Sequence, residues 1–202
     1  EFLRLGSPEL GVSLVSWRAL APGVLLVLGL WPVLLALDVL RSRWVSDPAR
    51  QELFVILTTP DIGGMAVVLL VLAVPPALME ETLFRGILQP LQEKAWGRWP
   101  AIVLTAVLFS AFHRSVEQAL VPFLLGLALG WLRSATDSLW PCIIGHALHN
   151  GVTAMAMIHL PGWMDPAAPI PPWPLWAGGM LLALAAARML GRRALKAPPA
   201  QW

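Results

Sequence analysis

Residues 75–90, PPALMEETLFRGILQP, place two adjacent carboxylates, Glu80 and Glu81, in a stretch that otherwise has the composition of an apolar helix. Charged side chains are costly inside hydrocarbon and are retained there where they meet a partner or serve a function. At about 100° per residue, Glu81 and Arg85 form an i,i+4 pair on one helix face, whereas Glu80 points elsewhere. We expect Arg85 to neutralise Glu81 and to leave Glu80 free as a general base.

The composition of the whole chain is that of a membrane protein. Of its 202 residues, 57% are hydrophobic and 13% are charged, and the mean hydropathy is +0.70, outside the usual range of soluble domains. Apolar runs of about 20 residues, the length that crosses a bilayer, recur along the chain, so a single signal peptide does not explain them. The net charge of +2 comes without a dense basic tract, which argues against a nucleic-acid partner.

These runs predict an all-α fold, a polytopic transmembrane helix bundle with a polar pocket inside the membrane. Six spans are expected, at residues 19–38, 64–82, 99–113, 118–133, 139–159 and 172–190. The number rises to seven or eight if shorter apolar segments such as 51–60, which we expect at the interface, also cross. The second helix is expected to continue past the glutamates to about Leu91.

The same pattern divides the chain into three regions. An N-terminal span and an interfacial segment occupy residues 1–63, a core of four spans occupies 64–160, and a Pro- and Trp-rich loop, a last span and a basic tail occupy 161–202. With a cytoplasmic N-terminus, ten Lys and Arg side chains lie on that side and four on the other, which favours both termini inside. Arginine- and alanine-rich usage points to a bacterial source, so we expect a bacterial plasma membrane.

Two further polar groups occur on apolar helices. In FSAFH, Phe109 lies one turn before His113, which puts an imidazole beside an aromatic ring at the membrane edge. In GHALHN, His146 and Asn150 share a helix face, and Asn150 is the only asparagine in the chain. His149 points about 60° away from His146 and is assigned no role.

Each group alone has an ordinary explanation: an acidic pair in solvated headgroups, a packed histidine at a helix end, and polar contacts between helices. Together they predict convergence, because an ionisable group in hydrocarbon is costly without a partner. In the resulting pocket, a water held between Glu80 and His113 would lose its proton to the carboxylate and attack a carbonyl. His146 and Asn150 would donate hydrogen bonds to the oxyanion, worth roughly 3 kcal/mol each.

The segments EETLFR, FSAFH and HALHN resemble the glutamate-glutamate-x-x-x-arginine, phenylalanine-x-x-x-histidine and histidine-x-x-x-asparagine motifs of the CPBP family of intramembrane proteases. That family includes the type II CAAX prenyl endopeptidases and the Abi-type bacteriocin-immunity proteins. The resemblance covers residues 75–155, with the motifs in the family's order. It implies that the first glutamate and first histidine activate water, and that the last histidine and asparagine stabilise the oxyanion. The implied catalytic residues are Glu80, His113, His146 and Asn150, supported by Glu81, Arg85 and Phe109.

The resemblance implies an endopeptidase that cuts near the C-terminus of a membrane-anchored or lipidated protein or peptide. The family was first described as metal-dependent, but we expect the glutamate to act as the base without a cofactor. Zinc held by Glu80, His113 and His146 is the less favoured alternative, because no short ligand spacing such as His-Glu-x-x-His occurs. A non-catalytic immunity or scaffold protein and a proton-coupled transporter are the alternative functions. The sequence has no evident internal repeat, a feature that many transporters have.

Overall fold

The computed structural model describes residues 16–45, 62–113, 118–160 and 169–194. In this part of the chain every regular element is a helix, and no strand occurs. The elements are α1 (Trp17–Ser42), α3 (Ile62–Glu81), η2 (Thr82–Leu88), α4 (Gln89–Trp96), α5 (Arg98–Phe112), α6 (Leu120–Thr136), α7 (Trp140–His159) and α8 (Trp173–Ala194). The all-α prediction is confirmed, and each of the six predicted segments is a helix to within four residues at either end. The segment expected at the interface, 51–60, lies outside the described residues.

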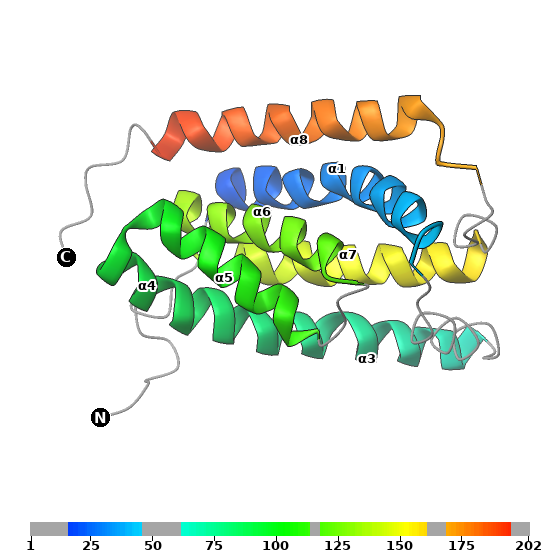
Figure 1. Ribbon diagram of the computed structural model, residues 1–202, viewed down its shortest axis with the longest axis horizontal. Helices are drawn as coiled ribbons and strands as arrows, with labels where there is room; N and C mark the ends of the chain where they lie inside the picture. The colour runs from blue at the N-terminus through cyan, green and yellow to red at the C-terminus, as the bar shows by residue number, and fades with distance from the viewer. Residues whose placement is uncertain (1–15, 46–61, 114–117, 161–168, 195–202) are drawn as a thin grey trace.

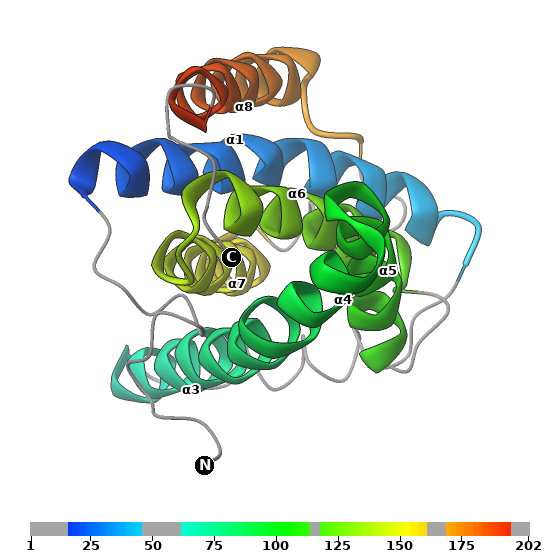
Figure 2. The ribbon, with the colours of Figure 1, turned by 90° about the vertical axis from the view of Figure 1, so that its left-hand side faces the viewer.

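The helices lie side by side along one axis, and successive helical runs point in alternating directions (Figure 1). Helix α8 packs on the outside of α1, and α7 contacts α1, α3 and α6 (Figure 2). Buried apolar side chains form a core that joins α1, α6, α7 and α8, and a smaller cluster joins α1 to α7. Because α7 lies among three neighbours, several of its faces are turned toward the interior.

One continuous helical run, formed by α3, η2 and α4, carries both glutamates near its middle. The run passes Pro75 and Pro76 and ends at Gly97, whose φ of 82° lies in the left-handed region that favours glycine. The expected continuation to about Leu91 is confirmed, and the run extends to Trp96. Its middle section, η2, is a π-helix, whose hydrogen bonds reach one residue further back than those of an α-helix.

Large apolar side chains cover much of the outer surface. They include Val67, Leu70, Val74 and Leu78 on α3, Val103 and Val107 on α5, and Leu181 and Leu184 on α8. By length and composition, α1 and α8 could each cross a membrane, while α5 and α6 are apolar but shorter. The six-span arrangement therefore stays a prediction beyond these two helices.

Candidate active site

Glu81 and Arg85 form a fully buried ion pair, as their spacing predicts. Arg85 Nη1 donates to Glu81 Oε1 at 3.0 Å, and Nη2 donates to the Gly126 carbonyl oxygen on α6 at 3.1 Å. The guanidinium carbon also lies 4.4 Å from the centroid of the Phe109 ring on α5. An uncompensated buried charge is strongly destabilising, so these contacts are what allow Arg85 to remain in the interior.

The π-helical turn was not anticipated from the sequence. A helical wheel at 100° per residue places residues four apart about 40° apart around the axis, and the drift adds up over successive turns. The wider turns of η2 reduce that drift and keep Arg85 facing α6, where Gly126 accepts its hydrogen bond. No residue pattern within Thr82–Leu88 distinguishes this turn from an ordinary α-helical one.

His146 contacts the second glutamate directly. Its Nδ1 lies 2.8 Å from Glu81 Oε1, and both side chains are buried. A carboxylate paired with arginine can only accept hydrogen bonds, so Nδ1 is the donor. The other ring nitrogen, Nε2, lies 3.9 Å from Glu80 Oε2, which is beyond hydrogen-bond length. Sequence reasoning gave Glu81 one partner, Arg85, and missed the second because His146 lies 65 residues away on another helix.

The Glu80 carboxylate makes no hydrogen bond to the described residues. Its side chain is 18% exposed, yet Oε2 is buried and has no hydrogen-bond partner among the described residues. Oε2 of Glu81 likewise has no partner among the described residues, but its Oε1 binds both Arg85 and His146, whereas neither oxygen of Glu80 makes a hydrogen bond to those residues. This is the division that the helical wheel predicts.

His113 lies immediately after α5 and reaches the same cluster through Phe109. Its Nδ1 donates to the Phe109 carbonyl oxygen at 2.9 Å, so in the neutral ring Nε2 is left as the acceptor. The Phe109 ring is fully buried, with its centroid 5.0 Å from that of the His113 ring and 5.7 Å from that of the His146 ring, both edge-to-face. Phe109 therefore touches both histidines as well as Arg85.

Asn150 and His149 occupy the next turn of α7. Asn150 is half-buried, and its side chain makes no hydrogen bond to the described part of the chain. His149 is buried, with no described partner for its Nδ1, while its backbone carbonyl accepts from the Thr153 hydroxyl at 2.8 Å. Among the described residues, none holds the Asn150 amide, which lies one turn beyond His146.

The structure gathers the predicted donors differently from a zinc site. Among the described residues, no three His, Cys, Asp or Glu side chains form a group that could hold a metal ion. The set weighed for zinc, Glu80, His113 and His146, does not form such a group.

Glu80 and Glu81 on α3, His146 on α7 and His113 just after α5 therefore lie around Phe109 inside an apolar helical bundle. The family described as type II CAAX prenyl endopeptidase Rce1-like matches residues 62–152, a segment that contains all three motifs. That segment is similar to this family of proteases, in agreement with the resemblance drawn from the motifs. No curated protein and no solved structure matches the chain.

Proposed function

We propose that the protein is an intramembrane endopeptidase, which hydrolyses a peptide bond near the carboxyl terminus of a membrane-anchored or lipidated protein or peptide. The contact between Glu81 and His146, with the unpartnered Glu80 oxygen beside it, is the observation that supports this most strongly. It puts a free carboxylate and an oriented imidazole together in a water-poor interior, where charge interactions are stronger than in water.

Glu80 serves as the general base in this mechanism. A water bound between its carboxylate and His113 transfers a proton to Glu80, and the resulting hydroxide attacks the scissile carbonyl carbon. The tetrahedral intermediate then collapses, the C–N bond breaks, and the leaving amine takes the proton from the Glu80 carboxylic acid. No covalent enzyme intermediate forms. His113 accepts a hydrogen bond from the water at Nε2, because its Nδ1 proton is held by the Phe109 carbonyl.

His146 and Asn150 stabilise the oxyanion. The Nδ1 proton of His146 is committed to Glu81, so Nε2 is the nitrogen that can face the substrate. To donate there, the ring must carry two protons, and the resulting positive charge has Glu80 and Glu81 as neighbours. The Asn150 side-chain amide is a second donor, one helical turn further along α7. A preorganised donor of this kind contributes roughly 3 kcal/mol to transition-state stabilisation.

Exposed tryptophans support a bundle that crosses the membrane. Trp17, Trp96 and Trp99 lie at one end of the helices, and Trp44 and Trp173 lie at the other, all largely exposed. Two such levels of indole rings are typical of proteins whose ends lie at the two membrane interfaces. With apolar side chains covering the surface between the levels, we infer that all six helical runs span the bilayer.

The distribution of charge supports a cytoplasmic location for both ends of the chain. The first residue of α1 and the last residue of α8 lie at the same end of the bundle (Figure 1). Arg18, Lys94 and Arg98 lie near that end, whereas Arg41 and Arg43 lie near the opposite one. An excess of Lys and Arg marks the cytoplasmic side. We therefore infer that the Trp17 end faces the cytoplasm of a bacterial cell.

The test of this function is hydrolysis by purified protein in proteoliposomes. Peptides with a prenylated cysteine near the carboxyl terminus, and the same peptides without the lipid, are incubated with the parent, with Glu80→Gln and with Asp137→Asn. Asp137 is the matched control, because its carboxylate is 72% exposed and pairs only with Arg133 in the contacts described. We expect the parent and Asp137→Asn to cut the lipidated peptide at one bond and Glu80→Gln to leave it intact.

Two other outcomes contradict the proposal. Cleavage by Glu80→Gln at the parent rate would show that hydrolysis does not need the Glu80 carboxylate. Absence of cleavage by the parent, together with unchanged termini in a proteomic comparison of membranes holding the parent or Glu80→Ala, would favour a non-catalytic immunity or scaffold role.

A further inference from the structure

Three contacts join the second helical run to α6 with one constant spacing. Arg85 Nη2 donates to the Gly126 carbonyl, Gln89 Nε2 donates to the Gly130 carbonyl at 2.8 Å, and the Ser134 hydroxyl donates to Glu93. In each pair the two residues are 41 positions apart in the sequence. The two helices therefore run in the same direction, locked in a single register, with each contact one turn beyond the last.

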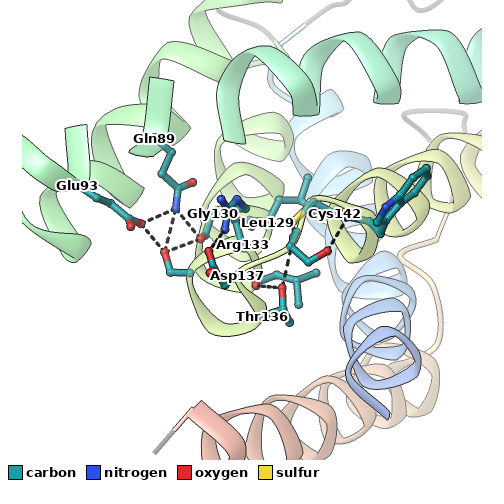
Figure 3. A network of polar contacts seen from close by, with 12 residues as sticks. Gln89, Glu93, Leu129, Gly130, Arg133, Thr136, Asp137 and Cys142 are labelled. Atoms are coloured by element: carbon teal, nitrogen blue, oxygen red, sulfur yellow. Dashed lines mark hydrogen bonds and ion pairs between the residues drawn. The ribbon is translucent and has the colours of Figure 1, made fainter. Parts of the chain in front are cut away.

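Gln89 is the centre of this arrangement. Its side chain is fully buried, and its Nε2 lies within hydrogen-bond distance of Glu93 Oε1, Ser134 Oγ and the Gly130 carbonyl (Figure 3). A side chain on residue 130 would compete for this place, because a Cβ there would lie 3.1 Å from Gln89 Oε1 and 3.2 Å from Ile102 Cγ2. Glycine at position 130 thus leaves room for the Gln89 carboxamide against the α6 backbone.

The contacts lead from Gln89 to the candidate active site. One turn before Gln89, the guanidinium of Arg85 links α6 to Glu81, and Glu81 holds Nδ1 of His146. A shift of this helix along α6 would move Arg85 away from its carbonyl and carry Glu81 away from His146. The orientation of the His146 ring therefore depends on the register between the two helices.

Apolar packing alone specifies such a register weakly. Apolar helices can slide past one another with little change in buried area, whereas a buried polar contact is satisfied in one register only, which is the best-attested role of buried polar residues. In the observed register Gln89 Nε2 has its acceptors, although Oε1 has no partner among the described residues. Leaving a buried donor unpaired costs about 1–3 kcal/mol, and each wrong register takes these acceptors away from Nε2.

We propose that Gln89, with Ser134 and Glu93 as its partners, is a positioning residue that fixes the register of Arg85 on α6 and thereby the Glu81–His146 contact. The expected change in kcat rests on the proposed function. The expected change in the Glu81–His146 contact is measured without any hydrolysis. Gln89 touches neither substrate nor water in this account and acts through Arg85.

The kinetic test compares three variants in proteoliposomes, with rates divided by the folded fraction. Gln89→Leu removes the amide nitrogen and with it the contacts to Glu93, Ser134 and the Gly130 carbonyl. Glu93→Gln keeps an acceptor oxygen, and Thr136→Val removes a hydroxyl that bonds within α6 to the Leu132 carbonyl. Misplacement of catalytic groups by about 1 Å can cost about 100-fold in rate. We expect Gln89→Leu to lower kcat about 10- to 100-fold at nearly constant KM, Glu93→Gln to lower it less, and Thr136→Val to match the parent.

The structural test uses the His146 ring itself. The chain has four histidines, so selective ¹⁵N labelling of histidine gives a spectrum simple enough to follow the hydrogen-bonded Nδ1 proton of His146. We expect this resonance in the parent and Thr136→Val, and its shift or loss in Gln89→Leu. Should Gln89→Leu fold poorly, Ser134→Ala removes one partner of Gln89 and should give a smaller change of the same kind.

The outcomes separate this proposal from the proposed function. A parent that cleaves no peptide contradicts the proposed function, while the resonance still tests the positioning role. Gln89→Leu with the kcat of the parent per folded molecule and an unchanged His146 resonance overturns the positioning role, whatever the protein hydrolyses. A fall in activity that only follows the folded fraction also overturns it.

Discussion

The Nδ1 atom of His146 lies 2.8 Å from Oε1 of Glu81, so the histidine is oriented by the glutamate that is already paired with Arg85. The two neighbouring carboxylates consequently have different tasks. Glu81 binds Arg85 and His146 through one oxygen, whereas Glu80 lies beside the cluster and makes no hydrogen bond to the described residues. Most of the expected mutational effects follow from this division.

Glu81→Gln should destabilise the fold far more than Glu80→Gln does. It leaves the Arg85 guanidinium uncompensated in the interior, at a cost of about 3–5 kcal/mol. The free energy of unfolding, measured by denaturant titration in detergent micelles, checks this. The double variant Glu81→Gln with Arg85→Met should recover part of the loss, since both buried charges are then gone. Equal stability of the Glu80 and Glu81 variants would contradict the buried pair.

Phe109→Leu should lower kcat without preventing folding. Leucine fills much of the volume but lacks the ring that meets Arg85, His113 and His146. We expect a loss of about 1–2 kcal/mol in stability and a larger fractional loss in hydrolysis. Rates per folded molecule, compared with those of Phe84→Leu, whose ring packs edge-to-face on Phe109 with centroids 5.2 Å apart, provide the measurement. A fall confined to the folded fraction would show that the ring only fills space.

Gly130→Ala should destabilise the protein, because the added Cβ would press on Gln89 and Ile102. Gly178 on α8 is the matched control, since no described atom lies within 4 Å of the Cβ that alanine would place there. Alanine is favoured over glycine in a helix by up to about 1 kcal/mol, so Gly178→Ala should be neutral or stabilising. Unfolding free energies that move in the same direction for both variants would contradict the close approach at Gly130.

His149→Gln should be mild where His146→Gln is severe. The two histidines share α7, but Nδ1 of His146 binds Glu81, whereas Nδ1 of His149 has no partner in the part of the chain that is described. Hydrolysis by His149→Gln should stay near the parent level, and His146→Gln should lose about 100-fold or more. Complete loss in His149→Gln alone would mean that the other face of α7 carries the chemistry.

The sequence was sufficient for features that depend on local spacing. Apolar run length located each helix, and the i,i+4 rule paired Glu81 with Arg85 before any tertiary information. The contact between Glu81 and His146 could not be derived, because it depends on how α3 and α7 pack. The π-helical turn and the constant register on α6 were missed for the same reason. They arise where Gly126 and Gly130 expose their carbonyls to a neighbouring helix, and the sequence shows only the glycines.

The central claim is that Glu80 removes a proton from the attacking water. The most direct test is the single-turnover rate of peptide hydrolysis by Glu80→Gln in proteoliposomes, at matched amounts of folded protein. A positioned general base contributes about 100- to 10,000-fold, so we expect the rate to fall by at least about 100-fold while peptide binding and the free energy of unfolding stay near the parent values. A rate within a few-fold of the parent would contradict the mechanism.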